Sequence, residues 1–256
     1  MAPTIHAPEG AAGPLRIGTA GWSLPRDSWP RFSAEGTHLQ RYARVFGAAE
    51  IDTSFYRPHQ PKTYARWADS TPEDFRFAVK LPKEITHQRA LRDAEAPLDD
   101  FLAQAGALGP RLGCLLVQLP PSLAFAPATV DAFLAALRQR HAGGVALEPR
   151  HASWFDGDAD RLLAHYRTAR VLADPPPHAG AGVAGGWPGL VYQRLHGAPR
   201  IYYSDYDSAS LQSWATRLQQ AAATGAECWC VFDNTAAGHA VPNALDFQAL
   251  LHGMAR

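Results

Sequence analysis

The chain has 256 residues, and its 24 lysines and arginines balance its 24 aspartates and glutamates. A formal net charge of zero excludes a general electrostatic attraction to nucleic acid or anionic membranes, so nucleic acid is a disfavoured but open partner. No apolar run approaches the roughly 18 residues that a membrane span needs. We therefore expect a cytoplasmic protein with no membrane partner.

The first residues of the chain are rich in proline, alanine and glycine and lack the apolar core of a signal peptide. We predict a flexible lead-in over residues 1–14 and one domain over residues 15–256. The three cysteines, Cys114, Cys228 and Cys230, all lie in strand-like runs. An odd number of buried cysteines favours reduced thiols, which agrees with a cytoplasmic location.

Short apolar runs typical of buried parallel strands alternate with stretches of helical periodicity. The strand-like runs begin near Leu15, Ala48, Phe75, Leu112, Gly144, Arg170, Leu190 and Cys228. Helical patterns cover residues 39–46, 61–68, 98–105, 130–137 and 211–218. Thr37 and Gln40 form a capping-box pattern before the first helix, and Pro61 suits the first turn of the second. This alternation predicts an α/β fold with a parallel sheet.

Eight strand signals in a single run favour a closed barrel over an open doubly wound sheet. The glycine fingerprint of a dinucleotide-binding turn is also absent after the first strand. The predicted fold is a single-domain TIM-type (β/α)8 barrel, for which roughly 250 residues is a typical length. The segment from Pro175 to Gly189 consists almost entirely of proline, glycine and alanine, which disfavour a regular helix. We therefore predict an irregular sixth crossover.

Most of the strand-like runs end in a polar side chain. Alternate side chains of a strand share a face, so the terminal polar residues that are in phase with the inward positions should meet at the carboxyl-terminal mouth of the barrel. These residues are Glu50, Lys80, Gln118, Glu148, Arg150, Arg194, His196 and Asn234. The same alternation predicts that Asp233 points the other way, towards the helix layer.

Carboxylates and an imidazole from separate strand ends suit acid/base chemistry. The candidate catalytic residues are therefore Glu50, Glu148 and His196. A structural ion pair between Glu148 and Arg150 explains the same pattern equally well, because buried pairs are often structural.

The basic residues predict an anion site. Lys80, Arg150 and Arg194 would form a cationic floor suited to a carboxylate, phosphate or sulfate. Mutual pairing with the carboxylates is the alternative. The other candidate ligand-binding residues are aromatic, amide or imidazole side chains: Trp22, Tyr56, His87, Gln118 and Asn234.

Motifs distributed along the chain resemble the YecE-like family, a domain of unknown function numbered seventy-two. They include 17–23 (IGTAGWS), 50–57 (EIDTSFYR), 77–80 (FAVK), 118–121 (QLPP), 148–151 (EPRH), 194–197 (RLHG) and 232–235 (FDNT). The resemblance covers residues 17–251 and implies a TIM-type barrel without implying a reaction. The sequence departs from the family pattern at Asp52 and Asp233, where that pattern has asparagine. A role that requires an uncharged amide is therefore in doubt at both positions.

Three hypotheses of function remain. The first is an enzyme that uses acid/base chemistry on a small anionic or polar metabolite at the barrel mouth. The second is a metal-dependent phosphodiesterase or isomerase with Glu50, Glu148, Asp174 and His196 as ligands. The third is a non-catalytic module that binds an anion or a nucleic-acid end. Because nearby cations would repel a metal ion, we predict no cofactor and no tightly bound metal. The sequence makes no prediction of oligomeric state.

Overall fold

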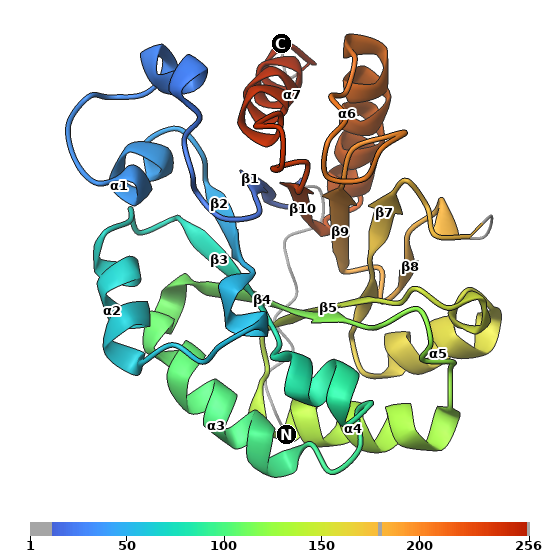
Figure 1. Ribbon diagram of the computed structural model, residues 1–256. Helices are drawn as coiled ribbons and strands as arrows, with labels where there is room; N and C mark the ends of the chain where they lie inside the picture. Colours follow the sequence, from blue (N-terminus) through green and yellow to red (C-terminus); the bar gives the residue numbers. More distant parts are fainter. Residues whose placement is uncertain (1–11, 179–180, 255–256) are drawn as a thin grey trace.

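The computed structural model describes residues 12–178 and 181–254 (Figure 1). Most of the lead-in predicted over residues 1–14 lies outside the described residues. Figure 1 shows the strands at the centre of the molecule and the helices around the outside. Within the described ranges, no helix has the length and apolar character needed to cross a membrane.

The strands form two sheets. The first is entirely parallel, and its order is β1 (Leu15–Thr19), β10 (Glu227–Phe232), β9 (Leu190–Leu195) and β7 (Leu172–Asp174). The second ends in an antiparallel strand, and its order is β2 (Ala48–Ile51), β3 (Arg76–Lys80), β4 (Leu112–Gln118), β5 (Gly144–Glu148), β6 (Ala169–Arg170) and β8 (Gly185–Gly186).

The prediction of a closed eight-stranded TIM-type barrel is therefore wrong, although the α/β class is correct. The two sheets meet at two seams, where neighbouring strands are not joined by a continuous ladder of hydrogen bonds. At the first seam, β1 and β2 are joined only by one isolated bridge, between Ala20 and Glu50. The hydroxyl of Tyr42 lies between these strands. It accepts a hydrogen bond from the Thr19 N–H at 2.8 Å and donates one to the Ala48 carbonyl at 2.9 Å. A side chain thus occupies the place of main-chain ladder bonds.

The second seam divides the sixth predicted strand. Ala169 and Arg170 pair with β5 on one edge and with β8 on the other, whereas Leu172–Asp174 pairs with β9. Because β8 occupies the free edge of β6, β9 cannot continue the same ladder. In the described part of the segment from Pro175 to Gly189, the chain forms β8 and no α-helix.

The helices cover the outer faces of the sheets. They are α1 (His38–Ala43), α2 (Pro61–Asp69), α3 (Glu95–Ala105), α4 (Pro127–Arg140), α5 (Gly157–His165), α6 (Ser208–Ala223) and α7 (Ala240–Met254). Short helical turns are η1 (Arg26–Arg31), η2 (Thr53–Phe55), the π-helical η3 (Glu84–Gln88), η4 (Gly106–Arg111) and η5 (Ala152–Trp154). The predicted capping box between Thr37 and Gln40 is confirmed, with both reciprocal hydrogen bonds present. Helices α5 and α7 were not predicted by periodicity.

An apolar cluster lies between the inner faces of the strands. It combines small residues with the stacked rings of Tyr192 and Trp229, whose centroids are 5.7 Å apart. Several of its members are in phase with the strand-end polar residues: Ala48 precedes Glu50, and Ala146 precedes Glu148, by two positions. The inner face therefore changes from apolar to charged along β2 and β5. The three cysteines are buried and free.

Candidate functional site

Arg194 of β9 lies at the centre of a buried charged cluster and is not exposed. Its Nε and Nη2 donate to the Glu50 carboxylate at 3.1 and 2.6 Å. Nη1 donates to Glu148 Oε2 at 2.7 Å, and Nη2 also donates to Asp233 Oδ2 at 3.0 Å. One guanidinium therefore connects the carboxyl ends of strands from both sheets.

Glu148 is the second centre of the cluster. Besides Arg194, its Oε1 accepts hydrogen bonds from Arg150 Nη2 at 3.1 Å, Gln118 Nε2 at 3.3 Å and His196 Nε2 at 3.2 Å. Burial opposes ionisation, but the charge of Arg194 and the contact with His196 outweigh it and hold the pKa of Glu148 well below its usual value. Glu148 is therefore an anion at neutral pH.

The His196 ring lies between two carboxylates. Its Nδ1 is 2.9 Å from Asp233 Oδ2 and its Nε2 is 3.2 Å from Glu148 Oε1. Ionised carboxylates only accept hydrogen bonds, so both ring nitrogens must carry hydrogen for both contacts to form. Burial lowers the pKa of His196, but these two hydrogen bonds more than reverse the effect and raise it. The arrangement holds His196 as the imidazolium.

The predicted orientation of Asp233 is wrong. Strand β10 ends at Phe232, and the Asp233 N–H donates to the Leu195 carbonyl at 2.8 Å. The inward phase of β10 is that of Trp229 and Val231, which belong to the inner apolar cluster, whereas Cys228, Cys230 and Phe232 belong to the other core cluster. Asp233 follows Val231 by two positions, and its carboxylate points inward to Arg194 and His196. Asp233 is therefore a member of the cluster that the sequence pattern missed.

Glu50 differs from Glu148 although both bind Arg194. Glu50 also accepts a hydrogen bond from the Tyr192 hydroxyl at 2.7 Å and is fully buried. Burial raises the pKa of Glu50 to about 7, against the opposing charge of Arg194 and with the help of the nearby negative charge of Asp52. Glu50 can therefore gain or lose a proton near neutral pH.

Asp52 and Lys80 form the outer side of the cluster. Asp52 Oδ2 is 3.6 Å from Arg194 Nη2, and its side chain is 27% exposed. Lys80 Nζ lies 4.0 Å from Asp52 Oδ1 and 4.4 Å from the centre of the Phe55 ring. Lys80 is buried, yet its ammonium makes no hydrogen bond within residues 12–178 and 181–254. Asp52 is a second member of the cluster that was absent from the predicted site residues. Its position two residues after Glu50 is the sequence signal that indicates it.

The structure brings most of the predicted site residues together. His87 on η3 joins them, because its ring packs edge-on against Phe55 at 4.9 Å. Burial together with the charges of Lys80 and Arg150 lowers the pKa of His87. The cluster and its edge comprise Glu50, Asp52, Lys80, His87, Gln118, Glu148, Arg150, Arg194, His196 and Asp233.

Three predicted ligand-binding residues lie elsewhere. Trp22 packs edge-on against Trp67 at a centroid distance of 5.1 Å, next to the core. Asn234 is buried, and its Nδ2 donates to the Ser204 carbonyl at 3.0 Å and to Asn243 Oδ1 at 2.8 Å. Its amide therefore holds a loop and does not reach into the charged cluster.

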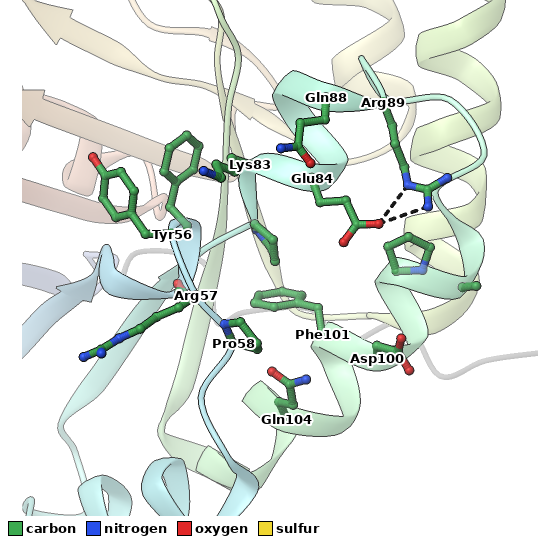
Figure 2. Close-up of a pocket in the computed structure, with 15 residues that line it drawn as sticks. Tyr56, Arg57, Pro58, Lys83, Glu84, Gln88, Arg89, Asp100, Phe101 and Gln104 are labelled. Atoms are coloured by element: carbon green, nitrogen blue, oxygen red, sulfur yellow. Dashed lines mark hydrogen bonds and ion pairs between the residues drawn. The ribbon is translucent and has the colours of Figure 1, made fainter.

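Tyr56 is 70% exposed and belongs to a separate pocket of about 440 Å³ between η2, η3 and α3. Figure 2 shows Phe101 and Pro58 in the middle of this pocket, with the amides of Gln88 and Gln104 above and below them. An ion pair between Glu84 and Arg89 closes one side at 3.0 Å. The pocket borders the cluster through Phe55, which lines the pocket and lies under the Lys80 ammonium.

Asp174, one of the ligands in the metal hypothesis, lies beside Tyr206. Asp174 Oδ2 accepts a hydrogen bond from the Tyr206 hydroxyl at 2.7 Å. In the part of the chain that the structure describes, no group of three or more His, Cys, Asp or Glu side chains could hold a metal ion. That the purified protein carries no tightly bound metal stays a prediction.

A family model described as a protein of unknown function, DUF72, matches residues 16–256. The chain belongs to the DUF72 family. UPF0759 protein YecE of Escherichia coli K12 is 36% identical over 171 residues, which are 64% of this chain and 60% of that protein. UPF0759 protein YunF of Bacillus subtilis 168 is 31% identical over 147 residues, 55% of this chain and 52% of that protein. The match thus spans about half to three fifths of these curated relatives.

Solved structures of this family have the same fold. A DUF72 family protein from Thermotoga maritima MSB8 has a TM-score of 0.77 at 24% identity and covers 93% of this chain and 99% of its own. One from Enterococcus faecalis V583 has a TM-score of 0.77 at 22% identity and covers 93% of this chain and 95% of its own. These likenesses concern the fold alone.

The raised pKa of Glu50 predicts a pH dependence of stability. Its folded value of about 7 exceeds the ordinary 4.5, so the folded state binds the proton more tightly, and this stabilisation is lost as the pH rises from about 4.5 to 7. In Glu50→Gln we expect the free energy of unfolding to depend less steeply on pH in this range, by up to about 1.4 kcal/mol per pH unit. Urea denaturation between pH 5 and 8 measures it, with Glu84→Gln as the exposed control. An unchanged slope in Glu50→Gln would show that Glu50 does not titrate here.

Proposed function

We propose that this protein is an enzyme that transfers a proton to or from a small anionic or polar substrate bound over the charged cluster. In parallel α/β sheets, ligands bind outside the carboxyl ends of the strands. The cluster lies at those ends of β2, β3, β5 and β9. Buried ion pairs are weak contributors to stability, so their concentration at this edge supports a functional role.

One observation carries the proposal. Glu50 and Glu148 share the guanidinium of Arg194, yet their pKa values are shifted in opposite directions. Glu148 has four hydrogen-bond donors, whereas Glu50 is close to a second carboxylate in a fully buried position. Environments that shift the pKa values of two neighbouring acids in opposite directions are typical of catalytic acid/base pairs. Glu50 is thus the proton carrier, and Glu148 is the fixed anion.

The carboxylate pair of Glu50 and Asp52 would move the proton. Glu50 is inaccessible, but Asp52 lies in phase with it and is partly exposed. Asp52 is a close neighbour of Glu50, so it can relay a proton between Glu50 and a substrate. The imidazolium of His196 would stabilise negative charge that develops on that substrate.

Lys80 and Arg150 would hold the anionic group of the substrate. The Lys80 ammonium faces Asp52 only at 4.0 Å, so it has donors to offer. Arg150 gives one Nη2 hydrogen bond to Glu148, and its side chain is 26% exposed. Arg194, by contrast, is buried and bound to carboxylates through Nε, Nη1 and Nη2. It is therefore a positioning residue, not the ligand contact that the sequence predicted.

The test of the anion site is a thermal-shift assay with phosphate, sulfate and simple carboxylates. A ligand that binds only the native state raises the melting temperature. We expect at least one of these anions to stabilise the wild type and to lose that effect in Lys80→Gln. Lys62→Gln is the matched control, because Lys62 is exposed on α2. Equal shifts in all three proteins would show that Lys80 does not bind the anion.

The test of catalysis is a metabolite pool incubated with the protein and followed by mass spectrometry. We expect depletion of an anionic compound by the wild type and by Lys62→Gln, and no depletion by Glu50→Gln. An anion that stabilises the protein without turnover of any compound in the pool would contradict the enzyme proposal. That outcome would instead identify a metabolite-binding protein.

A further inference from the structure

The loop between β9 and α6 fixes Tyr202 beside the charged cluster. The Tyr202 N–H donates to the His196 carbonyl at 2.5 Å, and the Tyr202 carbonyl accepts from the Ala236 N–H at 3.1 Å. The residue is thus tied by its main chain to the segments that follow both β9 and β10. Its ring meets the His196 ring edge-on, with centroids 5.7 Å apart.

The backbone of Tyr202 is strained. Its φ of 71° lies in the left-handed region, where a Cβ approaches the following carbonyl and a bulky side chain is unfavourable. Non-glycine residues in this region persist only where the surrounding structure enforces them, and they concentrate at functional sites.

Gly197 and Asn234 provide that enforcement. A Cβ at Gly197 would lie 2.7 Å from the Ser204 carbonyl oxygen and 3.0 Å from the Asn234 Cβ. The Asn234 amide donates to the same Ser204 carbonyl at 3.0 Å. The loop therefore folds back closely on the end of β9, which explains why Asn234 is occupied with the loop and not with a ligand.

The Tyr202 ring does not compensate for the strain by entering the core. Tyr202 remains 37% exposed. Burial lowers the pKa of Arg150, but the charge of Glu148 and the Tyr202 hydroxyl outweigh it and raise that pKa. The Tyr202 hydroxyl therefore lies close to the Arg150 guanidinium. The ring thus stands between His196, Arg150 and solvent, which is where a ligand over the cluster would lie.

We propose that Tyr202 is a specificity residue whose ring packs against a flat apolar group of the substrate, next to the anionic group held by Lys80 and Arg150. The ligand class is a phosphate or carboxylate that carries a ring beside its charge. This inference rests on the proposed function, because it needs the anion to bind over the cluster. Aromatic side chains bind such faces at modest entropic cost.

Two probes of equal charge separate the ring from the anion. Phenyl phosphate and methyl phosphate differ only in the flat apolar group, and calorimetric titration gives a Kd for each. We expect the wild type to bind phenyl phosphate roughly fivefold or more tightly, as stacking on an aromatic residue supplies. In Tyr202→Gly and Tyr202→Asn the two probes should bind alike, because the ring is gone. Glycine and asparagine are chosen because both tolerate a positive φ and therefore keep the loop conformation. Tyr203→Gly is the control, because Tyr203 is 44% exposed in the same loop.

Thermal denaturation of the same variants distinguishes a ligand contact from a structural role. We expect Tyr202→Gly to retain or raise the melting temperature, because it relieves the strained φ. A large fall in both Tyr202 variants would make the residue structural and overturn the proposal. Equal binding of the two phosphates by the wild type would also overturn it while leaving the anion site intact. If neither phosphate nor the carboxylate analogues benzoate and acetate bind, the proposed function and this inference fail together.

Discussion

We expect Arg194→Met to lower the free energy of unfolding by about 3–5 kcal/mol, the cost of leaving buried charges without their partner. Three carboxylates of the cluster, those of Glu50, Glu148 and Asp233, each accept a hydrogen bond from this guanidinium. Methionine fills much of the same volume but leaves these anions desolvated and close together. Urea denaturation at pH 7 measures the loss.

The pH dependence of the variant adds a second criterion. We expect the difference from the wild type to narrow as the pH falls from about 7 towards about 4.5 and below, because burial without Arg194 raises the pKa of these carboxylates and protonation neutralises them. Arg161→Met is the matched control, since Arg161 pairs with Asp158 on the surface and both side chains are mostly exposed. Surface ion pairs contribute little. A loss in Arg194→Met no larger than in Arg161→Met would contradict the central position of Arg194.

Glu148→Gln is expected to destabilise the fold by a similar amount, about 3–5 kcal/mol. The Glu148 carboxylate accepts from four donors, and the glutamine amide would present N–H groups to some of them. It would also remove the charge that holds His196 protonated, so the pKa of His196 should fall.

Two measurements check this prediction. Denaturation gives the loss of stability, with Glu84→Gln as the control because Glu84 forms a half-exposed pair with Arg89. Nuclear magnetic resonance titration of the His196 ring gives the shift of its pKa. A variant that keeps its stability but loses turnover would instead assign Glu148 to the reaction, as a catalytic acid or base. An unchanged pKa of His196 would show that Glu148 does not sustain the imidazolium.

The sequence predicted the parts of the site that depend on strand alternation. Glu50, Glu148 and Arg194 meet because each follows an inward position by two residues on its own strand. Alternation alone could not show whether Trp229 and Val231 or Cys228 and Cys230 face inward on β10. Trp229 and Val231 do, and this phase brings Asp233 inward. Nor could alternation show that Asn234 would bind the Ser204 carbonyl in a distant loop.

Charge pattern alone predicted that the basic residues form a floor for an anion. It could not show how the charges are distributed among partners, because pairing depends on distances that only the fold sets. In the structure Arg194 is neutralised by carboxylates from three other strand ends. Lys80 and Arg150 keep donors on the outer side of the cluster.

By itself the sequence determined the α/β class, the approximate starts of the strands other than β7 and β8, and the capping box of α1, because these follow from local periodicity and neighbouring residues. The tertiary structure decided whether the strands close. That outcome depends on Tyr42, whose hydroxyl enters the seam between β1 and β2, and on β8, which occupies the edge of β6. Both contacts join segments that no local pattern connects. The same holds for the pKa values of Glu50 and Glu148, since identical side chains acquire opposite shifts from the burial and charges that folding places around them.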